Sequence, residues 1–221
     1  MSSFFSTKKR IKEVLKPHYH RLQRMSKFYR RIGLHSKDFS IISNNCTGGY
    51  VYQYYGIPYN TPTEGLYFTT NDYIKLMRAP DYYFKKEVHL IDPQESSLAK
   101  EGRIINHPVG LIDDIEVYFL LYHDSEEALS KWYRRAARIN YKKLFFLLTE
   151  TELMKQGHVQ QFSETIEKKG YAGVCLTMND YKNNHAKFIP NIPLDEDNGN
   201  ASWKPEIIIS SLDWKNILNS L

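Results

Sequence analysis

The chain has 221 residues, of which 42% are hydrophobic and 25% are charged, so it can bury the core of one domain with an appendage. This composition excludes disordered and fibrous proteins, and the two cysteines, Cys46 and Cys175, provide neither a disulfide framework nor a paired-cysteine zinc site. No apolar run reaches the roughly 18 residues of a membrane span, and the first residues lack a secretory signal, so we expect a cytoplasmic protein.

The positive charge of the chain, +5 in total, is concentrated in its first 36 residues. That segment has ten lysine or arginine residues and one acidic residue, Glu13, and so carries +9, which leaves −4 for residues 37–221. The rest of the chain is mildly acidic, and we therefore expect no nucleic-acid partner. We expect two parts, a basic segment of residues 1–36 and a single α/β domain of residues 37–221.

Residues 1–36 have the pattern of a basic amphipathic helix. Apolar side chains recur there at intervals of three, four and seven residues, with an interruption at Pro17. These apolar positions are Ile11, Leu15, Leu22, Met25, Tyr29 and Ile32. Such a helix can lie on the anionic inner surface of the membrane or bind a polysaccharide enzyme. The alternative is a solvated helix packed against the body of the protein.

Beyond residue 37, short apolar runs alternate with amphipathic ones. In chain order they predict a strand at 38–43, a helix at 50–55, a strand at 65–68, a helix at 71–77, a strand at 115–122, a helix at 125–139, a strand at 144–148, a helix at 159–169, strands at 172–177 and 206–209, and a helix at 212–219. Residues 195–203 form a polar surface loop in this interpretation. Alternating strands and helices indicate an α/β fold, a mostly parallel sheet flanked by helices in three Rossmann-like layers.

The loop at residues 43–49, with the sequence SNNCTGG, follows the first expected strand. In open α/β sheets ligands bind beyond the carboxyl ends of strands, where a helix N-terminus presents N–H groups to an anion. Cys46 lies where that dipole would lower the thiol pKa and favour a thiolate nucleophile. A lone cysteine is, however, often a small buried apolar residue. The adjacent polar residues Asn44 and Asn45 favour the functional interpretation, whereas Cys175 lies in an apolar strand and is expected in the core.

A second polar stretch, Tyr59-Asn60-Thr61, lies between two prolines that keep the backbone extended. Asn60 and Thr61 are placed to orient a sugar hydroxyl or an oxyanion. They are equally suited to capping a turn, the usual role of these residues beside proline.

A third cluster brackets the expected strand at 115–122. Asp114 and Glu116 share one face at its start, where paired carboxylates can hold a divalent ion or act as acid and base. His123 follows its carboxyl end, which is where we expect the ligand site. The acidic residues can also be simple turn formers.

The helix at 125–139 places three arginines near one another. Arg134 and Arg138 are four residues apart, with Arg135 nearby, and guanidinium groups bind phosphate or carboxylate through paired hydrogen bonds. The alternative is an ordinary solvated helix face. Trp132 belongs to the apolar stripe of the same helix.

Four segments occur in an order that is similar to a known bacterial family. They are FSIISNNCTGGYVYQYYGIPYNTPTEGLYF, DYIKLMRAPDYYF, HPVGLIDDIEVYFLLYHDSEEALSKWYRRAARIN and LFFLLTE. They resemble domain of unknown function 1919 (DUF1919), whose members are often labelled exopolysaccharide biosynthesis proteins. The resemblance implies an α/β fold and a setting among capsule or exopolysaccharide enzymes, without a known reaction.

The residues that match the family pattern lie in the segments singled out above. They are Asn44, Asn45, Cys46, Tyr59, Asn60, Pro62, Asp114, Glu116, Trp132, Arg134, Arg135, Arg138 and Asn140. Relatives often have histidines where this chain has Tyr118 and Leu121. If those histidines act as bases, His123 has to take their place here.

We predict a transferase that acts on a capsule or exopolysaccharide precursor, most concretely by acyl transfer from acyl-coenzyme A to a sugar or nucleotide sugar. Cys46 would be the nucleophile or the neighbour of the thioester, His123 the base, and Asn45 and Asn60 the oxyanion donors. The substrate-binding residues would be Asn44, Tyr59, Thr61, Trp132, Arg134, Arg135, Arg138 and Asn140.

Two other functions remain open. One is a glycosyl- or glycerolphospho-transferase in which Asp114 and Glu116 hold Mg²⁺ or Mn²⁺ beneath a diphosphate. The other is a non-catalytic adaptor that residues 1–36 tether to the inner face of the membrane.

Overall fold

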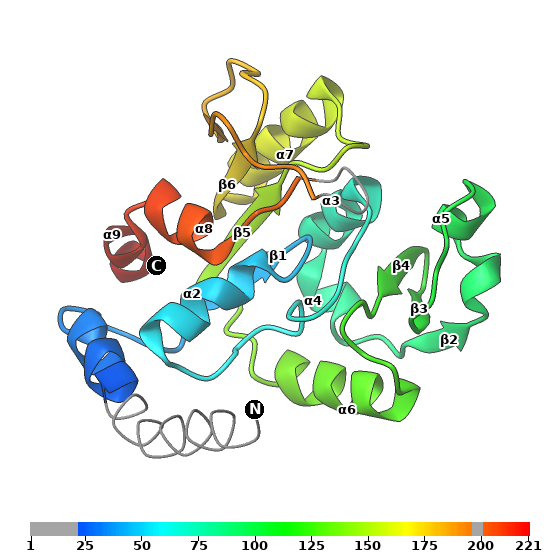
Figure 1. The fold of residues 1–221 in the computed structure, drawn as a ribbon, viewed down its shortest axis with the longest axis horizontal. Helices are drawn as coiled ribbons and strands as arrows, with labels where there is room; N and C mark the ends of the chain where they lie inside the picture. The colour runs from blue at the N-terminus through cyan, green and yellow to red at the C-terminus, as the bar shows by residue number, and fades with distance from the viewer. Residues whose placement is uncertain (1–21, 196–200) are drawn as a thin grey trace, which may run out of the picture.

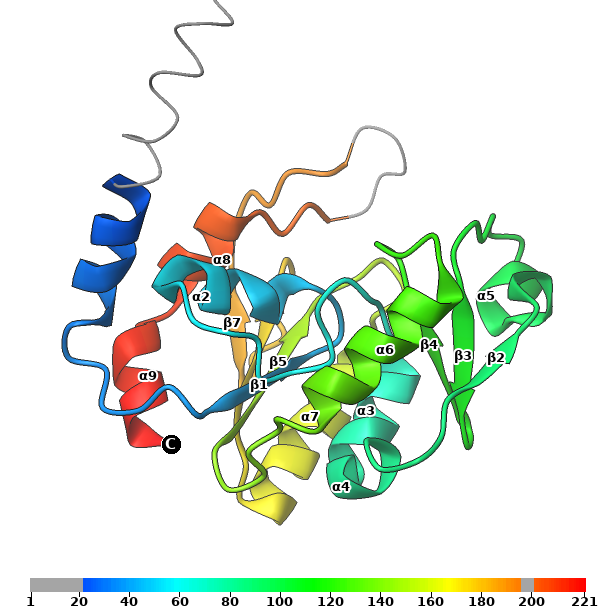
Figure 2. The same cartoon turned by 90° about the horizontal axis from the view of Figure 1, so that it is seen from below.

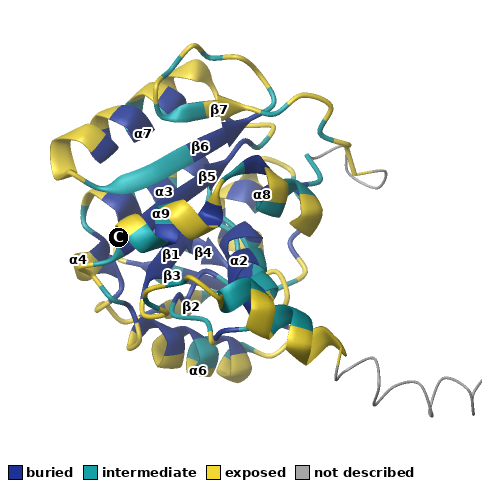
Figure 3. Ribbon diagram, turned by 90° about the vertical axis from the view of Figure 1, so that its left-hand side faces the viewer, coloured by how far each residue is buried: buried dark blue, intermediate teal, exposed yellow. Residues whose placement is uncertain are grey.

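A sheet of four parallel strands forms the centre of the computed structural model, which describes residues 22–195 and 201–221 (Figure 1). Its strands, in spatial order, are β1 (Ser40–Ser43), β5 (Leu144–Thr149), β6 (Ala172–Thr177) and β7 (Ala186–Phe188). Every residue of β1 and β5 is buried, as expected for parallel strands that helices cover on both faces (Figure 3). The predicted α/β fold with a mostly parallel sheet is confirmed.

Helices cover both faces of this sheet (Figures 1 and 2). One face packs against α2 (Thr47–Tyr55), α8 (Pro205–Ser211) and α9 (Trp214–Ser220), and the other against α3 (Thr70–Arg78) and α7 (Gln156–Lys169). Strand side chains alternate between the two cores, so that Ile41 packs toward α2 while Ile42 packs toward α3. The fully apolar strand sequences follow from this arrangement.

A separate antiparallel sheet carries the acidic cluster. Its strands are β2 (His89–Ile91), β3 (Val109–Ile112) and β4 (Ile115–Tyr118), with β3 in the middle. Asp113 and Asp114 make the two-residue turn between β3 and β4, and Asp113 takes a positive φ of 57° there. The remaining helices are α4 (Pro80–Tyr83), the 3₁₀ helix η1 (Pro93–Glu95), α5 (Ser97–Lys100) and α6 (Ser125–Ala136).

Two predictions around this sheet are wrong. The strand expected at 115–122 ends at Tyr118 and is antiparallel, because a tight hairpin pairs it with β3. At 65–68 the structure has no regular strand, only a single bridge between Tyr67 and Tyr118. The end of β4 is therefore not the carboxyl edge of the parallel sheet, and the reason for placing His123 at that edge is lost.

The strand expected at 206–209 is also wrong, because these residues belong to helix α8. Pro205 occupies the first turn of that helix. The backbone N–H groups there have no acceptor within the helix, so the missing N–H of proline costs nothing, and its fixed φ favours the helix. Four apolar residues in a row fit a buried helix as well as a strand. Trp203, expected in a polar loop, is buried and donates through Nε1 to the Glu150 carbonyl at 2.9 Å.

Part of the basic segment is described. Residues 22–31 are helical, and the chain after them reaches α9, where Asn219 donates to the Gly33 carbonyl and accepts from the His35 amide (Figure 2). The predicted apolar positions Ile11 and Leu15 lie outside the described residues. Among the described helices, none is both long and apolar enough to cross a bilayer.

Candidate functional site

The two asparagines after β1 tie the parallel strands together. The Oδ1 atom of buried Asn44 accepts from the Thr149 amide at 3.0 Å, and its Nδ2 donates to the Thr149 carbonyl at 3.1 Å. Asn45 Nδ2 donates to Thr149 Oγ1 at 2.8 Å. Both amides, predicted to bind substrate or an oxyanion, thus have partners that join the carboxyl ends of β1 and β5.

The first amide N–H groups of α2 donate hydrogen bonds to acceptors within the protein. The Thr47 amide donates to Asn45 Oδ1 at 3.0 Å, and the Gly48 amide donates to Ser43 Oγ at 3.2 Å. The Gly49 amide donates to the Cys46 carbonyl at 3.0 Å. Because these amides already have acceptors, the predicted anion site on the N–H groups of this helix is wrong.

Cys46 lies half-buried at the start of α2, with Sγ 3.8 Å from Tyr50 Oη. Burial raises the pKa of the thiol, and the nearby Glu64 carboxylate raises it further. The pKa of this thiol is therefore raised, not lowered as expected from its place at a helix N-terminus. At neutral pH Cys46 is therefore a thiol rather than a thiolate.

Glu64 brings an acid to the first turn of α2, where the loop after Thr63 packs against the helix. Its carboxylate lies over Gly49, in the space that a side chain at that position would fill. Gln53 Nε2 donates to Glu64 Oε1 at 3.4 Å and to Tyr59 Oη at 3.0 Å. Glu64 Oε2 is buried and has no hydrogen-bond partner in the described part of the chain.

The electrostatics of Glu64 follow from this burial. Desolvation raises the pKa of the carboxyl group from 4.5 to about 7, and the opposing charge of Arg135 compensates only in part. A carboxyl group with this pKa is present in both protonation states at neutral pH, as general acid–base catalysis requires. Perturbed carboxyl groups of this kind are enriched at functional sites.

Glu150 is a second buried carboxylate, and it differs from Glu64 in its hydrogen bonds. This carboxylate, at the end of β5, accepts from the Met178 and Asn179 amides, from Asn179 Nδ2 and from Tyr181 Oη. Its hydrogen-bonding capacity is used in holding the chain that follows β6. Glu64, in contrast, has an oxygen without a partner.

Arg135, one of the predicted substrate ligands, supports the Glu64 loop from the side of α6. The guanidinium is buried and donates to the Glu64 carbonyl at 2.9 Å and to Tyr122 Oη at 2.8 Å. It also lies 5.1 Å from the centroid of the Tyr59 ring. Arg135 and Tyr59 thus belong to the same cluster as Cys46 and Glu64.

Arg134, in α6, and Arg138, in the turn after it, remain accessible. Desolvation and the charges of Arg134 and Arg135 lower the pKa of Arg138, as expected for three neighbouring cations. Both guanidinium groups are exposed, and within residues 22–195 and 201–221 neither has a hydrogen bond or an ion pair from its side chain. The predicted role of these two side chains as phosphate ligands stays a prediction.

Four other predicted ligands have structural partners. Asn60 Nδ2 donates to the Lys37 carbonyl at 3.1 Å, and buried Thr61 Oγ1 lies 2.9 Å from Thr63 Oγ1. Asn140 Nδ2 donates to Asp38 Oδ2 at 3.2 Å. Trp132 is buried among Phe68, Phe84 and Phe119. These residues shape the loops and the core around the site.

His123 lies in a different place from Cys46. It lines a cavity of about 280 Å³ beside the antiparallel sheet, together with His107, Gln94 and Ser125. The structure records no contact between His123 and Cys46 among the described residues. The structure therefore does not bring the predicted base His123 together with Cys46; the acidic side chain whose charge acts on Cys46 is Glu64.

The two predicted metal ligands have separate partners. Asp114 pairs with Lys75 Nζ at 2.9 Å and accepts from Tyr83 Oη at 2.8 Å, and both contacts lower its pKa. Glu116 instead accepts from the Ser97 amide and from Ser97 Oγ. Within the described residues, no group of three or more His, Cys, Asp or Glu side chains could hold a metal ion.

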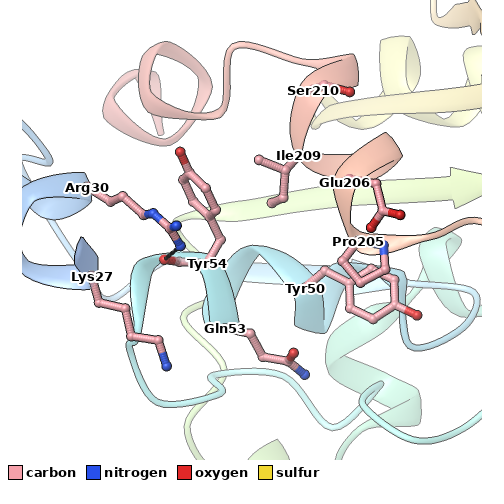
Figure 4. Close-up of a pocket in the computed structure, with 9 residues that line it drawn as sticks. All are labelled: Lys27, Arg30, Tyr50, Gln53, Tyr54, Pro205, Glu206, Ile209 and Ser210. Carbon is pink, nitrogen blue, oxygen red and sulfur yellow. Dashed lines mark hydrogen bonds between the residues drawn. The ribbon is translucent and has the colours of Figure 1, made fainter. Parts of the chain in front are cut away.

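A cavity of about 520 Å³ adjoins the cluster (Figure 4). Tyr50 and Gln53 of α2 line it and also contact Cys46 and Glu64, respectively. Its other walls come from α8 and from the helix at 22–31, which contributes Lys27 and Arg30. The cavity therefore offers space for a ligand next to the reactive groups.

Sequence reasoning missed Tyr50, Gln53, Glu64 and Tyr122. The PTEG sequence reads as a turn, in which an acidic residue is unremarkable. The available signal was Gly49, since two glycines in the first turn of a helix indicate that another group packs closely against that helix. The glycines do not indicate that this group is Glu64.

Comparison with known proteins identifies a family and one relative. A family model described as a domain of unknown function, DUF1919, matches residues 18–200. A Haemophilus influenzae protein described as an uncharacterized protein is 26% identical over 131 residues. The matched region is 59% of this chain and 59% of that relative, so the chain spans less than two thirds of its length.

Proposed function

The chain belongs to the DUF1919 family, and from this premise we propose that it is a transferase whose general base is Glu64. The proposed reaction is acyl transfer from an acyl-coenzyme A thioester to a hydroxyl group of a sugar or nucleotide sugar. The observation that carries the proposal is the carboxyl group of Glu64, which has a pKa of about 7 and a buried, unpartnered Oε2. Such a group can take a proton and return it within one catalytic cycle.

The reaction balances without a further reactant. The sugar hydroxyl loses its proton to the Glu64 carboxylate while its oxygen attacks the thioester carbonyl carbon. The tetrahedral intermediate then expels the coenzyme A thiolate, and protonated Glu64 returns the proton to that sulfur. The products are the sugar ester and a free thiol. Tyr50, whose pKa is raised by burial and which therefore stays neutral, can donate a hydrogen bond from its hydroxyl group to the oxyanion.

Cys46 takes the role of a neutral neighbour in this mechanism. Its raised pKa disfavours the thiolate that a covalent acyl-enzyme requires. Its place in the proposal is to contact Tyr50, which lines the cavity.

Arg134 and Arg138 are the proposed phosphate anchors, because their exposed guanidinium groups lack side-chain partners in the described structure. The family resemblance leads us to propose the biosynthesis of a capsule or exopolysaccharide precursor in the cytoplasm as the setting. The metal-dependent alternative has less support, since Asp114 and Glu116 bind different partners.

The test is the release of free thiol from acetyl-coenzyme A by the full-length protein in the presence of a panel of nucleotide sugars. We expect Glu64→Gln to lower the rate by about 10²- to 10⁴-fold, the usual contribution of a general base. Glu95→Gln, at an exposed carboxylate in η1, is the matched control and should keep the rate. Full activity of Glu64→Gln would exclude Glu64 as the base, and no thiol release by the wild-type protein would contradict acyl transfer.

A further inference from the structure

The helix at 22–31 turns its basic side chains toward the body of the protein. Arg30 donates to the Tyr54 carbonyl at 3.2 Å and lies 4.2 Å from the centroid of that ring. Arg31 donates to the Gly56 carbonyl at 3.0 Å, and the Lys27 stem packs where a side chain at Gly56 would lie. These cations contact the C-terminal end of α2, where the negative end of the helix dipole attracts positive charge.

The opposite side of the same helix is apolar and exposed, the reverse of an ordinary surface helix. Its large side chains recur at helical spacing and are between 46% and 65% exposed. They are Leu22, Met25, Phe28, Tyr29 and Ile32, and we call them the apolar stripe. The helix that carries the stripe projects beyond α2 and α9 (Figure 2).

We propose that the apolar stripe docks on an anionic lipid surface. The charge distribution selects this occupant, because residues 1–36 carry +9 whereas the remaining residues carry −4. Exposed Arg24 lies within the stripe segment. An apolar face flanked by cations is the pattern by which interfacial helices bind membranes, through apolar burial and attraction to anionic headgroups.

The cavity adjoins the side of the helix opposite to the stripe. Lys27 and Arg30 line that cavity and lie on the helix that carries the stripe (Figure 4). Docking does not depend on the proposed acyl transfer, since binding is measured without turnover.

The experiment is co-sedimentation of the full-length protein with vesicles, either of phosphatidylcholine alone or with phosphatidylglycerol added. We expect binding only to the anionic vesicles, and weaker binding at higher salt. The double substitution Met25→Ser with Phe28→Ser should weaken binding by about 10- to 100-fold, because two partly exposed apolar side chains no longer enter the lipid. Arg24→Gln should weaken it by about fivefold.

The matched control is Ile104→Ser, which removes an apolar side chain that is 83% exposed and lies outside the stripe. It should leave vesicle binding unchanged. Equal binding of the double variant and the wild-type protein would overturn the proposal, as would equal loss in the Ile104→Ser control. A wild-type dimer in vesicle-free buffer that the double substitution dissociates would also overturn it and assign the stripe to a second copy of the chain.

Discussion

The Glu64 carboxylate occupies the space above the Cα atom of Gly49, so that an acid from the loop before Gly65 packs directly on the first turn of α2. The contact removes Oε2 from water without giving it a hydrogen-bond partner among the described residues. This relationship raises the pKa of Glu64 and brings its charge close enough to Cys46 to raise the pKa of the thiol.

The first prediction concerns the dependence of stability on pH. The pKa of Glu64 in the folded protein, about 7, lies above the ordinary value of 4.5, so the folded state binds the proton more tightly than the unfolded state. The stabilising contribution of protonated Glu64 to the free energy of unfolding is present in full below pH 4.5. It is lost as the pH rises through 7. We expect the free energy of unfolding to fall by about 2 kcal/mol over this rise in pH. This is less than the full shift of the Glu64 pKa implies, because the side chain is only half-buried.

The measurement is the free energy of unfolding at about pH 5 and about pH 8 for the wild-type protein and for Glu64→Gln. Other groups titrate in this window, including Asp72, whose pKa is raised to about 6. The difference between the two proteins isolates Glu64. Identical pH dependence in both would show that the carboxyl group titrates normally.

The second prediction uses Gly49. Alanine in place of a helical glycine ordinarily stabilises a helix by roughly 0.5–1 kcal/mol. In Gly49→Ala the methyl group would displace the flexible end of Glu64 into solvent, so we expect a folded protein in which the pKa of Glu64 returns toward its usual range. The pH dependence of unfolding should then resemble that of Glu64→Gln.

Gly157→Ala in α7 is the matched control for this substitution, because nothing lies within 4 Å of a methyl group at that position. It should keep the wild-type pH dependence and gain the ordinary stabilisation. Wild-type pH dependence in Gly49→Ala would refute the role assigned to this contact.

The third prediction concerns the reactivity of Cys46. Since burial and Glu64 raise the pKa of its thiol, Cys46 should react with iodoacetamide more slowly at neutral pH than free cysteine does. Glu64→Gln removes the negative charge and should speed the reaction. Peptide-resolved mass spectrometry separates Cys46 from buried Cys175. A faster reaction than free cysteine would restore the thiolate hypothesis.

The fourth prediction concerns Asn44. Its side chain is fully buried and makes hydrogen bonds to the Thr149 amide, carbonyl and hydroxyl. Asn44→Ala leaves the buried Thr149 amide and carbonyl without these partners. We therefore expect the free energy of unfolding, measured by chemical denaturation, to fall by about 2–4 kcal/mol. Asn60→Ala, which removes a bond of a more exposed side chain to the Lys37 carbonyl, should cost less than about 1 kcal/mol. Equal losses would contradict the linking role of Asn44.

The sequence predicts the parallel core well because burial on both faces leaves a continuous apolar run. The strand expected at 172–177 has the bounds of β6, and Asp124 caps α6 through the Glu126 and Glu127 amides at the position expected. The strands β2 and β7 have three residues each and are largely exposed, so neither apolar run nor alternation marks them. Their pairing depends on tertiary contacts that a local pattern does not carry.

The candidate site is predictable only in part for a related reason. Cys46, Tyr59 and Arg135 come from loops and a helix that the sequence identifies, and the structure brings them together around Glu64. Glu64 itself reads as a turn residue, because its altered pKa depends on packing against Gly49. The prediction that His123 lies in the site with Cys46 depends on the expected parallel direction of one strand. That strand, β4, is antiparallel, and His123 lines another cavity.

The bonds between Asn44 and Thr149 also set an order for biosynthesis. They join residues 105 positions apart, and β1 pairs with β5 across the same span. As the ribosome releases the chain from its N-terminus, β1 has no neighbouring strand until β5 has been made, several seconds later at roughly 5–20 residues per second. The basic helix and the loop of Cys46 are thus made before β5, the strand that fixes that loop.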